Sequence, residues 1–356
     1  MIRLDRLIAG RMLFAFFIVL SVVGAVDFVF AIVDELGDVS DSYSFAGALS
    51  YITLTFPSSV YELFPFAALG GALLGLGSLA SNNELVVMRA SGISVWRIVW
   101  SVAKPTFFLM ILGLILGEYV APPLDKFGQD KKAELQGYAG DEREGFWQKS
   151  GKEFIYIDAV ASDGRTMYNV IRYTLDDEGS FKSYITARRA EFSVEGDDWN
   201  LIEIRETELN SNSNSIQTIE LPRSNWESGL SPNLLQVLSQ DPDTQSISGL
   251  FRFSQFLDRE GLESSSYYLA FWKKILQPFM TLALVLLGVS SVFGPLREVT
   301  TGYRVFVGLT AALSFTIIQR ILEPTSILFG FSPLFAALLP IFIAAGLGLF
   351  MLNRTR

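Results

Sequence analysis

The sequence contains neither cysteine nor histidine. No disulfide bond can therefore stabilise any part of the chain, whatever compartment that part faces. Structural and catalytic zinc sites rely on cysteine and histidine, and haem iron is mostly held by one of the same two residues. We therefore expect no metal site and no haem.

Motifs for covalent chemistry are also missing from the sequence. The glycine-rich stretch GGALLGLGS lacks the Lys-Ser or Lys-Thr of a Walker A phosphate loop and lies inside an apolar run. Neither the G-x-S-x-G elbow of the α/β-hydrolases nor the H-E-x-x-H motif of metalloproteases occurs. We expect no catalytic residues, and we interpret Gly71 and Gly75 as positions where helices pack closely in lipid.

Apolar residues make up 50% of the chain and fall into long blocks. About 20 apolar residues are needed for a helix to cross the hydrocarbon core of a bilayer. Six blocks meet that requirement, so we predict an α-helical membrane protein with six transmembrane helices. They are Met12 to Val33, Tyr61 to Leu79, Ile98 to Ala121, Ala270 to Phe293, Tyr303 to Leu322 and Ser332 to Leu352.

A polar segment from about Pro122 to Leu262 separates the third block from the fourth. Short runs rich in β-branched and aromatic residues, such as EFIYIDAV and TMYNVIRYTL, alternate there with turn-forming clusters. This pattern predicts an all-β domain, which could be a sandwich, a jelly roll or an open barrel. From Ser248 the pattern becomes helical and ends before Gly261, which indicates a short amphipathic helix leading into the fourth span.

Basic residues indicate the orientation, because cytoplasmic loops of membrane proteins are enriched in lysine and arginine. The arginines near the predicted spans fall on one side: Arg3, Arg6, Arg11, Arg89, Arg97, Arg297, Arg304, Arg354 and Arg356. We therefore expect both termini in the cytoplasm and the β domain outside, with the first block retained as a signal anchor. The net charge of −9 is spread over loops and the outer domain, and we expect no nucleic-acid partner.

The connection between the second and third blocks reads SNNELVVMRASGISVWR. Ser81 and Glu84 match the S-x-x-E capping box, Gly92 is a typical helix stop, and a further helix can begin near Ser94. We predict a rigid helix at about residues 81–92, with Leu85, Val86 and Met88 on or near one face and with Glu84 and Arg89 exposed to water. This helix could merely join two spans at the membrane surface, or it could be a docking element that transmits a partner's movement.

Several stretches together resemble one family. The stretch FPFAALGGALLGLGSLASNNELVVMRASG, with GEYVAPP, SISGL, FWKKILQP and VFGPLR, resembles the LptF/LptG permease family of the lipopolysaccharide-export ABC transporter, and LptG more than LptF. The matches extend over essentially the whole chain. The resemblance implies three spans and a coupling helix in residues 1–121, a periplasmic β-jelly-roll domain in 122–262 and three spans in 263–356.

The resemblance also implies partners and a division of labour. A cytoplasmic LptB-like ABC ATPase dimer would bind ATP with Mg, and this chain would bind no cofactor. An LptF-like sister permease and a single-span, LptC-like periplasmic jelly-roll protein would complete the machine in the bacterial inner membrane. By resemblance, the coupling helix contacts the ATPase through Glu84, Leu85, Met88, Arg89 and Gly92. Lipopolysaccharide would enter a cavity between the two permeases, and ATP-driven changes of this cavity would move it to the β domains.

Candidate substrate and gate residues follow from charge. Lys126, Lys131 and Lys132 lie just after the third block, where they could bind lipid A phosphates or simply face solvent and headgroups. Charged residues within or near spans usually face protein or a cavity, which singles out Asp27, Glu62, Glu118 and Arg320. We predict a gate salt bridge between Asp27 and Arg320, the two of these on the spans that resemble the family's lateral gate.

Two departures from the family pattern limit the gate prediction. Some members have a lysine near Ala31 and an aspartate near Gln319, and neither residue is present here. Two other classes of protein also stay open: a permease for another lipid or for lipoproteins, and a membrane scaffold that transports nothing. The six spans argue against the former, and binding of an ATPase would argue against the latter.

Overall fold

The computed structural model describes most of the chain, with gaps that fall mainly in loops. The described residues are 2–40, 43–135, 145–150, 153–161, 164–175, 181–193, 198–210, 215–228, 230–232, 234–235, 241–259, 264–293 and 299–354. They form a helical unit (Met1–Ser40, Ser44–Gly128 and Pro242–Arg356) and a β unit (Asp41–Tyr43 and Gln129–Asp241). Each unit is described by itself.

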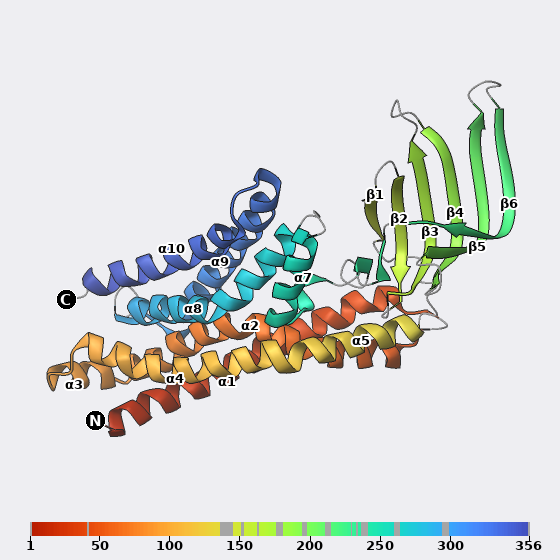
Figure 1. Cartoon of the computed structure of the whole chain (residues 1–356). Coiled ribbons are helices and arrows are strands. Elements are labelled where there is room, and N and C mark those ends of the chain that lie inside the picture. The colour runs from red at the N-terminus through yellow and green to blue at the C-terminus, as the bar shows by residue number, and fades with distance from the viewer. Residues whose placement is uncertain are drawn as a thin grey trace. The chain divides into compact units, whose positions relative to one another are not determined.

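Long helices build the helical unit (Figure 1). In the described residues, six continuous helical segments are long and apolar enough to cross a membrane, which confirms the predicted number of spans. They contain α1 (Ile2–Glu35), α2 (Phe45–Ser81), α4 (Val95–Ile115), α8 (Ser265–Phe293), α9 (Thr301–Phe329) and α10 (Pro333–Arg354). A short helix, α3 (Glu84–Ala90), joins α2 to α4.

The third span is longer than predicted. A π-helical turn at Leu116–Val120 links α4 directly to α5 (Ala121–Leu135), so one helical segment continues past the expected end at Ala121. Two prolines, Pro122 and Pro123, follow the π-helical turn in the first turn of α5. Proline inside a helix removes a backbone donor and usually breaks or kinks the helix, but here a π-helical turn comes immediately before the two prolines and the helix continues through them.

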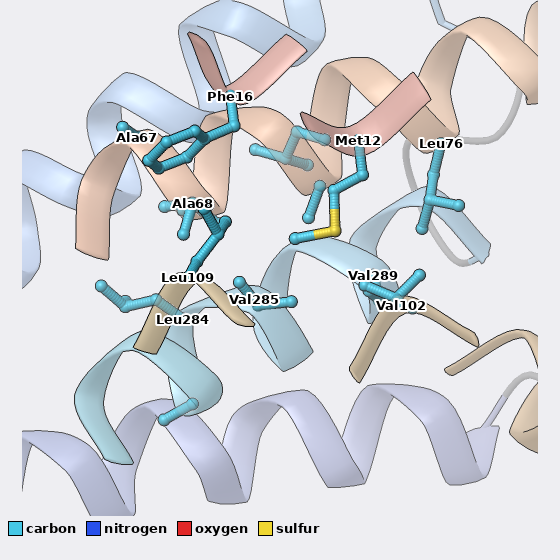
Figure 2. Close-up of a cluster of buried hydrophobic side chains, with 14 of the residues drawn as sticks. Met12, Phe16, Ala67, Ala68, Leu76, Val102, Leu109, Leu284, Val285 and Val289 are labelled. Atoms are coloured by element: carbon cyan, nitrogen blue, oxygen red, sulfur yellow. The ribbon is translucent and has the colours of Figure 1, made fainter. Parts of the chain in front are cut away.

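The core of the helical unit lies between α1, α2, α4 and α8 (Figure 2). Buried side chains from all four helices meet there: Met12, Phe16, Ala67, Ala68, Leu76, Val102, Leu109, Leu284, Val285 and Val289. Glycines bring α1 and α2 close together. A Cβ on Gly75 would lie 2.8 Å from the Met12 Cα, and one on Gly71 would lie 3.0 Å from the Phe16 Cα. The packing role predicted for these glycines is confirmed.

Six antiparallel strands form the β unit, and each pairs with its neighbour in the chain, in the order β1-β2-β3-β4-β5-β6. They are β1 (Phe146–Ser150), β2 (Glu153–Val160), β3 (Thr166–Leu175), β4 (Phe181–Ser193), β5 (Asp198–Asn210) and β6 (Ser215–Trp226). The all-β prediction is confirmed. A jelly roll has two sheets, whereas the described strands form one meander. Most of the turns predicted from the sequence lie outside the described residues.

A crease crosses this sheet from β2 to β6. The five residues Asp158, Asn169, Arg188, Glu203 and Pro222 would occupy one row, but regular pairing is interrupted at this row between every two adjacent strands. The backbone is left-handed at Asn169 (φ 48°) and Glu203 (φ 54°), and Pro222 has no N–H to donate. The register is the same on both sides, so the crease bends the sheet without shifting its strands.

The crease also changes which residues point inward. In β2 to β5, buried residues on its two sides are three positions apart instead of two: Ile157 and Val160, Met167 and Val170, Ala187 and Ala190, Leu201 and Ile204. Because all four strands change phase at the same row, the apolar face remains continuous across the bend. A groove of about 670 Å³ follows the crease over β3 to β6.

The β unit is shorter at both ends than the predicted domain of residues 122–262. Residues up to Gly128 continue the third span, and residues from Pro242 pack with the helical unit. The predicted amphipathic helix is present as α7 (Ile247–Arg259), which buries Leu250, Ser254 and Leu257. This helix therefore belongs with the spans, while its expected stop at Gly261 lies outside the described residues.

Candidate functional site

The helix α3 starts differently from the predicted capping box. Ser81 is the last residue of α2, and its Oγ donates to the Ser78 carbonyl at 3.0 Å. The N-cap of α3 is Asn83, whose backbone is left-handed (φ 60°) and whose side chain makes no capping hydrogen bond. The capping box is therefore wrong. A tight turn at Asn82 and Asn83, residues that tolerate this conformation, reverses the chain instead.

The end of α3 follows the prediction closely. The Gly92 N–H donates to the Arg89 carbonyl at 3.0 Å, and the Ile93 N–H donates to the Met88 carbonyl at 3.1 Å. These two bonds form a Schellman motif, which needs the left-handed backbone that Gly92 adopts at φ 84°. Ser94 then caps α4 by accepting from the Arg97 N–H. Defined turns on both sides make α3 a rigid connector.

The two faces of α3 differ in character. Leu85 is buried, and Met88 packs against the core of the helical unit. Val86 and Val87 are 41% and 62% exposed, so Val86 does not share the buried face as predicted. Arg89 is exposed and Glu84 is half-buried, and within the described part of the chain the Glu84 carboxylate has no hydrogen bond or ion pair. The outer face thus offers valines between a free carboxylate and a cation.

Asp5 ties the first helix to the third span beside α3. Its carboxylate accepts from Arg97 Nη2 at 3.1 Å, from Ser101 Oγ at 2.6 Å and from Lys104 Nζ at 2.5 Å. All three donors lie on α4, within its first three turns. The sequence analysis missed this cluster, although a single aspartate among the N-terminal arginines was the available signal.

Replacing Asp5 with asparagine is expected to lower the melting temperature, because two cations lose a charged acceptor. We expect the decrease to be small, because Lys104 is 48% exposed and remains partly hydrated. Thermal unfolding in detergent measures the effect. Asp27→Asn is the control, since it removes a carboxylate from the same helix with no hydrogen-bond or ion-pair partner among the described residues. Equal melting temperatures would contradict the role given to Asp5.

A second polar cluster lies at the opposite end of the spans. Lys273 on α8 places its Nζ 3.3 Å from the Asp243 Oδ1 and 3.2 Å from the Glu323 Oε2 of α9. The neighbouring Lys274 donates to the Gln245 carbonyl at 2.5 Å and lies over the Tyr61 ring. These lysines connect the segment before α7 to α2, α8 and α9.

Glu118 strengthens the same connection from the third span. The π-helical turn carries this carboxylate to the start of α7, where it accepts from the Ile247 N–H at 2.6 Å and from the Ser248 Oγ at 2.8 Å. A carboxylate at a helix N-terminus satisfies backbone donors that have no partner within the helix. At the other end of α7, hydrogen bonds from Ser264 and Tyr268 lower the pKa of Asp258.

The predicted gate residues do not pair in this chain. Arg320 is exposed and lines a cavity of about 430 Å³ together with Glu62, Lys273 and Glu323. Asp27 is half-buried on α1, and it forms no ion pair with Arg320. Helix α1 packs mainly on α2, and α9 packs on α2 and α10, so their outer faces point away from their own chain. The prediction of an Asp27–Arg320 pair within one chain is wrong.

The three predicted lysines lie on α5, and so within the extended third span rather than beyond it. Lys126 is exposed, next to Asp125, which is buried and hydrogen-bonded to Ser58. Lys131 and Lys132 are half-buried, and the Lys132 Nζ lies 5.7 Å from the centre of the Tyr43 ring. Among the described residues, no group of three or more acidic side chains is placed to hold a metal ion.

Comparison with known proteins agrees with this architecture. The family model for "Lipopolysaccharide export system permease LptF/LptG" matches residues 6–354. The chain belongs to this family. It is 35% identical to the lipopolysaccharide export system permease protein LptG of Escherichia coli K12 over 346 residues, or 95% of this chain and 94% of the relative. It is 31% identical to LptG of Haemophilus influenzae Rd over 356 residues, or 99% of each chain.

Membership of the LptF/LptG family confirms the resemblance found in the sequence and identifies the chain as a lipopolysaccharide export permease. Such a permease with six apolar helices is a multi-pass protein of the inner membrane. The polar contacts of Asp5, Glu118 and Lys273 with α4, α7 and α9 were not visible in the sequence, because each joins residues 50 to 130 positions apart.

Proposed function

We propose that this chain is one membrane half of an ATP-driven machine that extracts lipopolysaccharide from the outer leaflet of the inner membrane. ATP, with Mg, is hydrolysed by a separate cytoplasmic ABC ATPase dimer, and this chain binds no cofactor. The absence of a Walker A motif from the sequence supports this division.

The observation that carries the proposal is the geometry of α3. A helix held by a tight turn at Asn83 and a Schellman motif at Gly92 can transmit a displacement that a flexible loop would absorb. Its exposed face combines Val86 and Val87 with the unpaired Glu84 carboxylate and with Arg89. Such a face suits a groove with an apolar floor and a basic side chain, and Glu84 is the group we expect that basic side chain to bind.

The orientation follows from the same end of the molecule. The N-terminus, the C-terminus and α3 lie together at one end of the helical unit (Figure 1). Arginines gather in the sequence near these points, which supports a cytoplasmic location for this end. The β domain, inserted between the third and fourth spans, is then periplasmic.

Two helices provide the surfaces for the partner subunits. The apolar stretches of α1 and α9 are only 11% buried within this chain, against 67% for α2. Apolar faces of this size could contact lipid alone, but one coupling helix serves only half of a two-fold ATPase dimer. We assign a sister permease, LptF-like, to these faces, with a cavity for lipopolysaccharide between the two chains and an LptC-like periplasmic protein as the next acceptor.

Basic residues at the periplasmic end are the candidates for lipid A phosphates. Lys126 is exposed, and Arg320 lines the cavity formed with Glu62 and Lys273. The β domain receives the released molecule, and the groove along its crease offers the partly exposed Ile171 and Leu221 beside Arg188 and Arg205. A surface with both apolar and cationic groups fits a phosphorylated, acylated lipid.

Affinity purification of the tagged chain from its native membranes tests the proposal. Wild type is expected to co-purify with an ATPase and a second six-span permease. Glu84→Ala should weaken ATPase retention, and Glu84→Arg should reduce it at least tenfold, because a like charge replaces the attraction. Ser81→Ala is the matched control, since Ser81 is exposed and its hydroxyl only donates to Ser78 within α2. Absence of any ATPase from the wild-type sample would favour a scaffold that transports nothing.

A further inference from the structure

Arg304 is the most deeply buried cation of the helical unit in the described residues. It lies in the first turn of α9, and only 1% of its surface is exposed. Its Nη1 donates to the carbonyl of Gly77 on α2 at 2.7 Å, so this carbonyl is one of the partners of the buried guanidinium. A charge in such a place is costly unless its donors are satisfied, which makes this contact difficult to break.

Glycine at position 77 makes room for this contact. A Cβ built there would lie 2.9 Å from the Arg304 Cδ and 3.0 Å from its Nη1. The arginine side chain thus occupies the space that any other residue at position 77 would fill. One turn further along α9, Gly308 is equally close to α2, where a Cβ would lie 2.6 Å from the Leu73 Cδ1.

The contact sits at the base of α3. Gly77 precedes the end of α2 at Ser81 by one helical turn, and α3 begins at Glu84. A groove of about 730 Å³ beside it is lined by Leu85, Val86 and Arg89 of α3 as well as by Arg304. Any force on α3 therefore reaches the last turn of α2 within a few residues of the Arg304 contact.

The helix α9 has few other attachments inside the chain. Its outward side chains, among them Phe306, Leu309 and Leu313, are more than half exposed. Inside the chain it packs on α2 and α10, and its far end is tied by the ion pair of Glu323 with Lys273. Because the outward face of α9 is exposed along much of its length, displacement of its first turn can tilt the helix.

We propose that Arg304 is a positioning residue that transmits movement of α3 and the end of α2 to the fifth span, α9. When α3 is displaced, the carbonyl of Gly77 moves with it, and the buried guanidinium follows because losing this acceptor would leave its Nη1 donor without the Gly77 hydrogen bond. The first turn of α9 is thereby drawn along with α2. The inference rests on the proposed function, since α3 is displaced only if an ATPase acts on it.

The test measures coupling in the complete complex, purified with its ATPase and sister permease and reconstituted in liposomes that contain lipopolysaccharide. Two rates are recorded together: ATP hydrolysis and transfer of lipopolysaccharide to a soluble periplasmic acceptor. Gly77→Ala displaces the guanidinium without changing any charge. Arg304→Lys keeps the charge but loses the reach and the fork of the guanidinium. Gly302→Ala is the control on α9, because a Cβ there meets nothing within 4 Å.

For Gly77→Ala we expect transfer per ATP to fall at least fivefold while hydrolysis stays within twofold of wild type. Arg304→Lys should give an intermediate ratio, and Gly302→Ala should match wild type. A structural role alone would lower both rates together and leave their ratio unchanged, and that result would overturn the inference. Lack of ATP-dependent transfer in wild type would instead refute the proposed function, and the inference with it, before any variant is compared.

A distance measurement provides a second readout that does not depend on transport. Because the chain has no cysteine, Asn82→Cys just before α3 and Gly302→Cys at the start of α9 can be spin-labelled without removing native thiols, and both sites are exposed and outside the proposed docking residues. With the native Gly77, we expect the distance between the labels to stay constant through the ATP cycle. With Gly77→Ala, we expect this distance to change during the cycle. A distance that changes equally with and without Gly77→Ala would show that α9 does not follow α2 through Arg304.

Discussion

Gly75→Val is expected to yield almost no folded protein in detergent. Even the Cβ of an alanine at this position would lie 2.8 Å from the Met12 Cα and 3.0 Å from the Arg11 carbonyl oxygen. Both neighbours are backbone atoms of α1, so no side-chain rotation can relieve the overlap and the two helices must separate. Overpacking in a core usually costs about 1–3 kcal/mol, and we expect a cost above this range where backbone must move.

Gly346→Val in α10 is the matched control for this prediction. Gly346 also lies within a transmembrane helix, but a Cβ there meets nothing within 4 Å. Both substitutions place a β-branched residue in a helix, so their intrinsic helix propensities change equally. Yield after size-exclusion chromatography and the melting temperature are the measurements. Similar values for the two variants would show that α1 and α2 are not held as closely as described.

Lys273→Met should reduce stability more than any other single change in the polar cluster of Lys273, Asp243 and Glu323. It leaves Glu323 of α9, which is 18% exposed, without the cation that lies 3.2 Å away. Removing one partner of a buried ion pair costs roughly 3–5 kcal/mol, and because Lys273 itself is 25% exposed we expect the lower end of this range. The melting temperature in detergent should fall clearly below that of Lys126→Met, which removes an exposed lysine.

A double substitution separates the ion pair from other effects of the lysine. Adding Glu323→Gln to Lys273→Met removes the uncompensated carboxylate, and we expect it to recover part of the lost stability. Asp243 needs no such rescue, because it is 54% exposed and remains hydrated. If the double variant is less stable than Lys273→Met by the full cost of Glu323→Gln alone, the two residues act independently and the pair contributes nothing.

Hydropathy was sufficient to predict the six spans, since lipid exposure requires long apolar runs whatever the details of packing. It could not place the end of the third span. The prolines of the motif GEYVAPP predict a helix end, yet the helix continues through the π-helical turn at Leu116–Val120 to Leu135. The end of the third span depends on the hydrogen bonds of this π-helical turn, for which the sequence shows no recognisable pattern.

The connector α3 was predicted in the right place with the wrong start. Ser81 and Glu84 have capping-box spacing, but Ser81 completes α2 and the turn is made by Asn82 and Asn83. Asparagine's tolerance of left-handed backbone was the stronger signal. The end at Gly92 was predictable because glycine adopts that conformation without strain. The start of α4 was predictable because serine is a preferred N-cap residue, and Ser94 caps this helix.

The crease in the sheet shows where strict alternation of inward and outward side chains fails as a predictor of burial. Strict alternation predicts that Met167 and Asn169 share a face, whereas Asn169 is exposed and the next buried residue after Met167 is Val170. The change of spacing from two residues to three can be recognised as a crease only when the strands are aligned, because it falls in the same row of four strands. The sequence analysis treated each strand separately, and it therefore predicted the strands but not the crease that crosses them.

Energy transfer from a separate ATPase to lipopolysaccharide is the central claim, and one reconstitution tests it most directly. Liposomes would contain lipopolysaccharide, this chain, the sister permease and the ATPase, with a soluble periplasmic acceptor outside. The account predicts that lipopolysaccharide appears on the acceptor only with ATP, and that Glu84→Arg lowers the amount at least tenfold. Equal transfer without ATP, or with this chain left out, would contradict it.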